Sequence, residues 1–205
     1  MSHNEVPKSF PQEPKARADV KTGTLYAISG VSNWIYYGQK SDDRTIGFFR
    51  RRDRQVANSA DILSSPIMSR LLIFYDSVGR AFRSGAWKKL GRYATCTELR
   101  ESHPFVQWPV GTLDVTVWVG GVERTVTRVE DPAIQYLEIM AFYDAEYHVP
   151  ERLAVDFDPV EASQTVENAW AIGGPIWRER RVREERARRH PSPWNELPAD
   201  WVPTG

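Results

Sequence analysis

The sequence of 205 residues lacks most of the features that would identify a chemistry. A single cysteine, Cys96, excludes an intramolecular disulfide and fits the reducing cytoplasm best. No run approaches the roughly 20 apolar residues that a membrane helix needs, and no early apolar run with a cleavage site indicates a signal peptide. The 27 basic and 27 acidic residues cancel, so the net charge points to no class of partner.

Motifs for catalysis and for cofactor binding are also missing. There is no serine elbow, no zinc-ligand spacing and no phosphate-binding loop. Asp144, Glu146 and His148 alternate, and on a strand they would share one face as metal ligands do, but a polar strand edge explains the same spacing. Cys96 has no histidine nearby in sequence, which is typical of a small buried residue. We therefore expect no catalytic residue, no metal, no cofactor and no enzymatic activity.

Aromatic and β-branched residues are plentiful and indicate a β-rich core. Apolar residues make up 41% of the chain, with eight each of Trp, Tyr and Phe. Gly, Ser, Asn and Asp separate four segments of this composition in the first half. The predicted strands are Thr24–Ser29, Asn33–Gln39, Thr45–Phe49 and Leu71–Asp76.

The clearest hairpin spans Asp114 to Val129, around a two-residue turn at Gly120-Gly121. Simple pairing across this turn predicts one apolar face and one polar face, with Trp118 on the polar one. The apolar face would hold Val115, Val117, Val119, Val122 and Val126.

The last third of the chain indicates helices. Asp158 followed by Pro159 and Glu161 is a capping box, and it predicts a helix that runs to about Ile172. A second helix is predicted over Ile176–His190. The apolar segment 135–143 fits a strand or a helix equally well.

These elements predict an α+β fold. Its N-terminal part would be a β-rich twisted antiparallel sheet or a small barrel, with C-terminal helices packed on it. We expect a flexible arm over residues 1–20, a β-rich domain over 21–150 and a helical extension over 151–205. Trp194 and Trp201 indicate that the proline-rich tail lies back on the domain.

Charge is unevenly spread along the chain. Between Glu130 and Glu167 there are ten carboxylates and one basic residue, Arg152. Residues 1–129 hold 19 basic and 12 acidic residues, an excess of seven positive charges. The two regions either pack against each other or leave an acidic surface that attracts a basic partner.

Arginine is concentrated in two places. RRRDR, residues 50–54, follows a predicted strand and reads as a phosphate clamp or, more simply, as a solvated strand end. WRERRVREERARRH, residues 177–190, reads as a nucleic-acid-binding arm or as a solvated helix with internal ion pairs. The expected pairs are Glu179 with Arg183, Glu184 with Arg188 and Glu185 with Arg189.

The segment GTLYAISGVSNWIYYGQ, residues 23–39, resembles the opening of immunity protein family twenty-six, found in bacterial polymorphic toxin systems. AWKKLGRY and the Pro-Phe pair that follows it are similar to later family features, and the resemblance covers roughly residues 20–118. The residues that carry it are Gly23, Tyr26, Ala27, Ile28, Tyr37, Gly38, Trp87, Leu90, Gly91, Pro104 and Phe105.

The resemblance implies a cytoplasmic protein that binds and blocks a cognate toxin. The long extension from Asp156 onward departs from the family's short domain. Many such toxins have basic clefts, so an acidic patch with an aromatic anchor is the predicted contact surface. Its members would be Trp118, Glu130, Asp131, Glu138, Asp144, Glu146, Glu151, Asp156 and Asp158.

Two other functions fit the sequence. A nucleic-acid-binding adaptor would use an SH3-like barrel over residues 24–49 together with both arginine segments, and its affinity would fall steeply with salt. An enzyme would need a cleft with a perturbed acid–base pair. We rank the immunity protein first, the adaptor second and the enzyme third.

Overall fold

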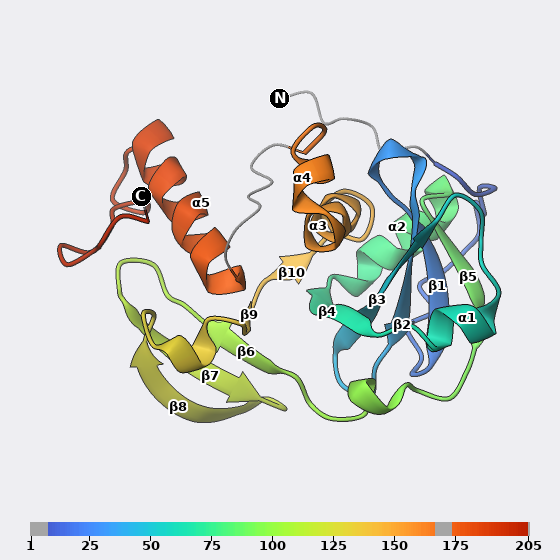
Figure 1. Ribbon diagram of the computed structural model, residues 1–205, viewed down its shortest axis with the longest axis horizontal. Coiled ribbons are helices and arrows are strands. Elements are labelled where there is room, and N and C mark those ends of the chain that lie inside the picture. The colour runs from blue at the N-terminus through green and yellow to red at the C-terminus, as the bar shows by residue number, and fades with distance from the viewer. Residues whose placement is uncertain (1–7, 167–173, 205) are drawn as a thin grey trace. The chain divides into compact units, whose positions relative to one another are not determined.

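The computed structural model describes residues 8–166 and 174–204, which group into two compact units. Unit 1 comprises residues 8–102 and 141–166, and unit 2 comprises 103–140 and 174–204. Ten strands in two mixed sheets and five α-helices confirm the α+β class (Figure 1). The chain leaves unit 1 and returns to it, so boundaries at residues 20 and 150 do not coincide with these units.

Unit 1 contains a six-stranded sheet of order β10-β4-β3-β2-β1-β5. All neighbours are antiparallel except β10, which pairs parallel with β4. The strands are β1 Thr24–Ser29, β2 Ile35–Lys40, β3 Thr45–Asp53, β4 Ile67–Ile73, β5 Trp87–Arg92 and β10 Phe142–Tyr143. The helices of this unit are α1 Ser59–Leu63, α2 Tyr75–Ser84, α3 His148–Phe157 and α4 Pro159–Ala162, with 3-10 turns at Val31–Asn33 and Thr97–Leu99.

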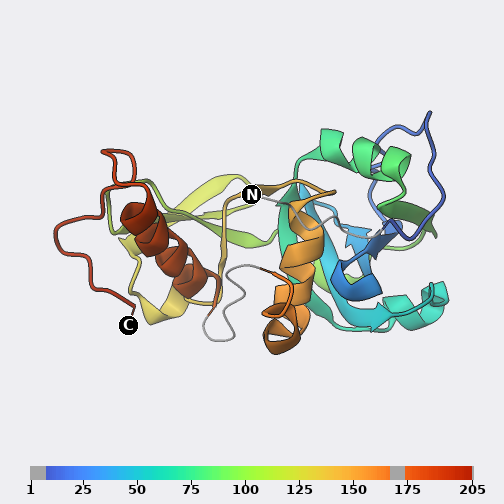
Figure 2. The ribbon, with the colours of Figure 1, turned by 90° about the horizontal axis from the view of Figure 1, so that it is seen from above.

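Both faces of this sheet are buried. Helices α2 and α3 lie beside the strands (Figure 2) and share one apolar cluster with them, whose largest fully buried side chains are Trp87, Tyr26 and Tyr36. Tyr37 and Phe49 pack on the opposite face with Ile62 of α1. Because both faces are covered, β1 and β2 are buried along their length and show no alternation of buried and exposed residues.

Several predicted features of unit 1 are wrong. Strand β3 runs to Asp53, so residues 50–53 lie in the strand and do not follow it. Strand β4 ends at Ile73, and residues up to Ser84 form the amphipathic helix α2, which Gly85 ends with φ 78°. Asp144 does not lie on an alternating strand, because its carboxylate accepts hydrogen bonds from two following N–H groups just before α3. The helix capped by Asp158 ends at Ala162, and the rest of its predicted span reaches residues outside the described part of the chain.

The segment 8–20 is anchored, whereas the sequence predicted a loose arm. Phe10 is buried at 8% exposure, and its N–H donates to the carbonyl of Gly85 at 3.1 Å. The hydroxyl of Tyr26 donates to the carbonyl of Asp19 at 2.6 Å. One buried aromatic side chain and a few hydrogen bonds are enough to fix a segment that has no regular structure.

Unit 2 contains a four-stranded sheet of order β8-β7-β6-β9, in which β6 and β9 are parallel. The strands are β6 Pro104–Gln107, β7 Asp114–Val119, β8 Val122–Arg128 and β9 Glu138–Ile139. Helix α5, Pro175–Arg189, covers one face, and a 3-10 turn spans Pro132–Ile134. The ambiguous segment 135–143 thus supplies two-residue strands to both sheets, a result of non-local pairing that no local pattern predicts.

The β7–β8 hairpin turns at Gly120 and Gly121, both with positive φ, as predicted. A bulge at Arg124 changes the predicted face, because pairing shifts by one residue between Glu123 and Thr125. Val126 therefore lies opposite Thr116 and is 59% exposed, while Val115 and Val117 are buried.

Candidate protein-binding site

The predicted acidic surface is divided between the two units. Asp144, Glu146, Glu151, Asp156 and Asp158 belong to unit 1, and Glu130, Asp131, Glu138 and Trp118 belong to unit 2.

In unit 1 most of these carboxylates meet cations of the same unit. Arg80 pairs with Asp144, and Lys8 lies 3.8 Å from Glu146. Asp156, whose side chain is 6% exposed, pairs with Arg152 at 2.9 Å. These contacts favour the alternative in which the basic and acidic stretches neutralise each other inside the fold.

Arg52 is the centre of the most elaborate of these contacts. Its guanidinium lies between the rings of Trp34 and Phe157, 4.2 and 4.4 Å from their centroids. It also donates to Glu161 at 2.6 Å, and the indole N–H of Trp34 donates to the same carboxylate at 2.8 Å. Hydrogen bonds from Trp34 and then Arg52 hold the pKa of Glu161 below its usual value. Asp158 caps α4 and lies 3.9 Å from Arg52.

The rest of RRRDR is also engaged within unit 1. Arg51 pairs with Asp53 at 2.8 Å, and Arg50 lies over Phe157. Arg54 lies 3.6 Å from the ring centroid of Trp34. A phosphate clamp would require these guanidinium groups to leave their present partners.

In unit 2 the predicted residues have partners as well. Asp131 accepts from Thr127 and from the N–H of Ala133, and Glu130 lies 3.5 Å from Arg128. Glu138 is buried at 7% exposure. Trp118 is half-buried and donates to Gln107 at 2.9 Å. Within the predicted set, Glu151 alone has no hydrogen bond or ion pair from its side chain to the described residues.

Two of the three predicted ion pairs on α5 are confirmed. Glu179 pairs with Arg183 at 2.9 Å, and Glu185 pairs with Arg189. The pair of Glu184 with Arg188 is wrong, because Arg188 binds Glu185 instead.

Glu184 is occupied by the C-terminal tail. Its carboxylate accepts from the indole N–H of Trp201 at 2.9 Å and from the hydroxyl and N–H of Thr204. Burial alone would raise the pKa of Glu184, but hydrogen bonds from Thr204 and Trp201 outweigh burial and hold the pKa below its usual value.

Trp201 stacks on Trp108, with ring centroids 5.7 Å apart and an interplanar angle of 11°. This contact confirms that the tail lies back on the domain. The other tail tryptophan, Trp194, does not pack in the same way and is 83% exposed.

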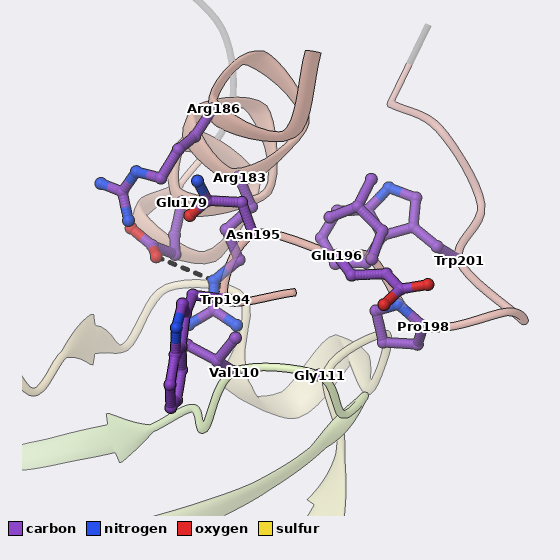
Figure 3. A pocket seen from close by; sticks show the side chains of 11 residues that line it. Val110, Gly111, Glu179, Arg183, Arg186, Trp194, Asn195, Glu196, Pro198 and Trp201 are labelled. Carbon is purple, nitrogen blue, oxygen red and sulfur yellow. Dashed lines mark hydrogen bonds and ion pairs between the residues drawn. The ribbon is translucent and has the colours of Figure 1, made fainter. Parts of the chain in front are cut away.

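A pocket of about 380 Å³, including space open to solvent, lies beside Trp194 in unit 2 (Figure 3). Its walls come from α5, from the β6–β7 loop and from the tail. Two charged residues of the lining, Arg186 and Glu196, have no hydrogen bond or ion pair from their side chains to any described residue. Arg183, also in the lining, donates to the carbonyls of residues 108 and 109 and holds the β6–β7 loop against α5.

Sequence reasoning missed this pocket. Trp194 gives no local signal of its exposure, which depends on where the tail lies. No local signal distinguishes Arg186 from the other arginines of α5, because its freedom follows from the positions of the glutamates and of the tail.

Other kinds of site are not formed by the described residues. Among them, no three His, Cys, Asp or Glu side chains are placed to hold a metal, and no helix is long and apolar enough to cross a membrane. Cys96 is half-buried, and burial raises the pKa of its thiol. Comparison with known proteins adds no relative: no protein-family model, curated protein or solved structure matches the chain.

Proposed function

We propose that this protein acts by binding another protein through unit 2, with Trp194 as the central contact. The observation that carries the proposal is an indole that is 83% exposed in a tail fixed on both sides. Asn195, the next residue, donates back to the carbonyl of His190 and closes the segment around Trp194, and further along Trp201 is held by Trp108 and Glu184. An anchored backbone reduces the entropy that a contact residue loses on binding, and Trp and Arg dominate the affinity of many interfaces.

The resemblance of residues 20–118 to immunity protein family twenty-six supplies the biological setting. In that setting the partner is a bacterial toxin, the protein neutralises it by contact in the cytoplasm, and no chemistry is required of the protein. The carboxylates between Glu130 and Glu167 support the proposal less than expected, since most of those described already have partners in the fold. The pocket of unit 2 is the better supported contact surface.

The test is binding and protection by the full chain against the toxin encoded beside its gene. Trp194→Ala is expected to weaken binding about 30-fold, as loss of roughly 2 kcal/mol at an interface centre does. Trp118→Ala, in the same unit, is the matched control and is expected to change affinity less than about threefold. A larger effect of Trp118→Ala would move the contact to the hairpin, and absence of both binding and protection would refute the proposal.

A further inference from the structure

We infer that the partner presents an acidic segment to the pocket of unit 2, with a carboxylate for Arg186 and an apolar or aromatic side chain for Trp194. This inference rests on the proposed function, because it names the chemistry of the partner at the same pocket. It reverses the charge expected from the sequence, in which the protein supplied the carboxylates.

The cation of the site is Arg186. Of the seven arginines of α5, the other six are engaged within the chain. Arg186 lines the pocket, is exposed, and has no side-chain partner among the described residues. A guanidinium binds a carboxylate with two parallel hydrogen bonds, and such charge-assisted bonds are about twice as strong as neutral ones.

The apolar part of the site lies in the same pocket. Trp194 lines it together with Val110, which is 61% exposed, and Leu197 (Figure 3). The 380 Å³ of this pocket includes open solvent, so its enclosed space is far smaller than that of a small-molecule pocket. An open hollow of this size fits one or two side chains of a protein segment better than a buried cofactor.

Glu196 argues against nucleic acid as the occupant. Its carboxylate lines the pocket and has no partner among the described residues. A chain of phosphates would bring repeated negative charge beside it, whereas a single carboxylate can bind Arg186 and leave Glu196 in water. Stacking of a base on Trp194 alone would still lack the several free cations that phosphate binding uses.

The chemistry of the occupant is tested first with defined probes on the full chain. Fluorescein-labelled Gly-Asp-Phe-Asp-Gly is compared with Gly-Asn-Phe-Asn-Gly by anisotropy, and oligothymidine is the third probe. The aspartate peptide is expected to bind about tenfold more tightly than the amide peptide, with the difference lost at high salt. Equal binding of the two peptides, no binding of the aspartate peptide, or tighter binding of oligothymidine would overturn the inference.

Variants assign the effect to Arg186. Arg186→Gln is expected to remove the preference for the aspartate peptide, and Glu196→Gln to increase it. Arg188→Gln is the matched control, because Arg188 lies on the same helix with its side chain 71% exposed, outside the pocket lining and paired with Glu185. Equal effects of the substitutions at 186 and 188 would overturn the inference.

The same variants with the cognate toxin separate the inference from the proposed function. If Trp194→Ala weakens toxin binding and Arg186→Gln does so by about tenfold more than Arg188→Gln, both stand. If only Trp194→Ala weakens binding, the pocket is the contact surface but its partner is not acidic. If neither variant changes binding, the contact surface lies elsewhere and the proposed function loses its site.

Discussion

The two units differ in the charged side chains that they leave without partners. Unit 1 places cations from the first half of the chain against carboxylates of residues 141–166, as Arg80 does with Asp144 and Arg52 with Glu161. Unit 2 leaves one cation, one carboxylate and one indole of its pocket without partners among the described residues. A long stretch of one charge in sequence therefore does not identify a charged surface, because the fold decides which charges are neutralised.

The largest expected effect comes from removing the contacts of Arg52 in unit 1. Arg52→Met removes the guanidinium between Trp34 and Phe157 and leaves Glu161 with the indole N–H as its remaining donor. Because Glu161 is partly exposed, the expected loss is about 2 kcal/mol, less than for a fully buried pair. Urea denaturation monitored by hydrogen exchange measures this loss of unfolding free energy, because exchange reports on each unit separately.

The control for that prediction comes from the other unit. Arg186→Met removes an arginine that has no side-chain partner, so the free energy of unfolding is expected to change by less than about 0.5 kcal/mol. If Arg52→Met and Arg186→Met lower the free energy of unfolding equally, the contacts of Arg52 do not stabilise unit 1.

A smaller effect is expected from the side-chain contacts that hold the C-terminal tail within unit 2. Trp201→Ala removes the stack on Trp108 and the indole donor to Glu184, and should release the tail. The expected cost is about 1.5 kcal/mol, since an aromatic pair and one hydrogen bond to a charge are lost. The expected result is faster amide exchange at Thr204 with little change in unit 1. Unchanged exchange at Thr204 would show that Trp201 does not hold the tail.

Acid should weaken both units, and Glu161 in unit 1 and Glu184 in unit 2 are two of the carboxylates responsible. Hydrogen bonds lower the pKa values of Glu161 and Glu184, so each stabilises the fold above the unfolded value of about 4.3. That stabilisation is lost as the pH falls through the lowered folded values. Glu161→Gln should flatten the pH dependence of unit 1 and Glu184→Gln that of unit 2, as denaturation between pH 5 and pH 2 measures. A change in the other unit would contradict the assignment.

Local features of the sequence predicted local structure well. The bounds of β1, the turn at Gly120-Gly121 and the cap at Asp158 follow from composition, glycine and proline within a few residues. The strands β9 and β10 could not be predicted, because two residues hold no pattern and each exists through a partner strand far away in sequence.

The candidate site was harder to predict than the fold. Ion-pair rules assigned Glu184 to Arg188, but Trp201 and Thr204 of the tail donate to Glu184, and Arg188 pairs with Glu185. Tryptophan is usually buried on average, which made Trp194 look like a packing residue. Its exposure and the freedom of Arg186 depend on where the tail lies, and the sequence alone does not encode that in any local pattern.

The smallest expected effect concerns the bulge in β8, which made the predicted faces of the hairpin wrong. Deletion of Arg124, the unpaired residue of the bulge, leaves Thr125 opposite Val117 and Val126 opposite Thr116, as they are now. Every other side chain of β8 keeps its face, so the unfolding free energy of unit 2 should change by less than about 1 kcal/mol. Replacing Arg124 by Ala keeps the bulge and serves as the control. A deletion that unfolds unit 2 would show that the strand cannot pair without the bulge, and that the bulge is a structural requirement of this edge.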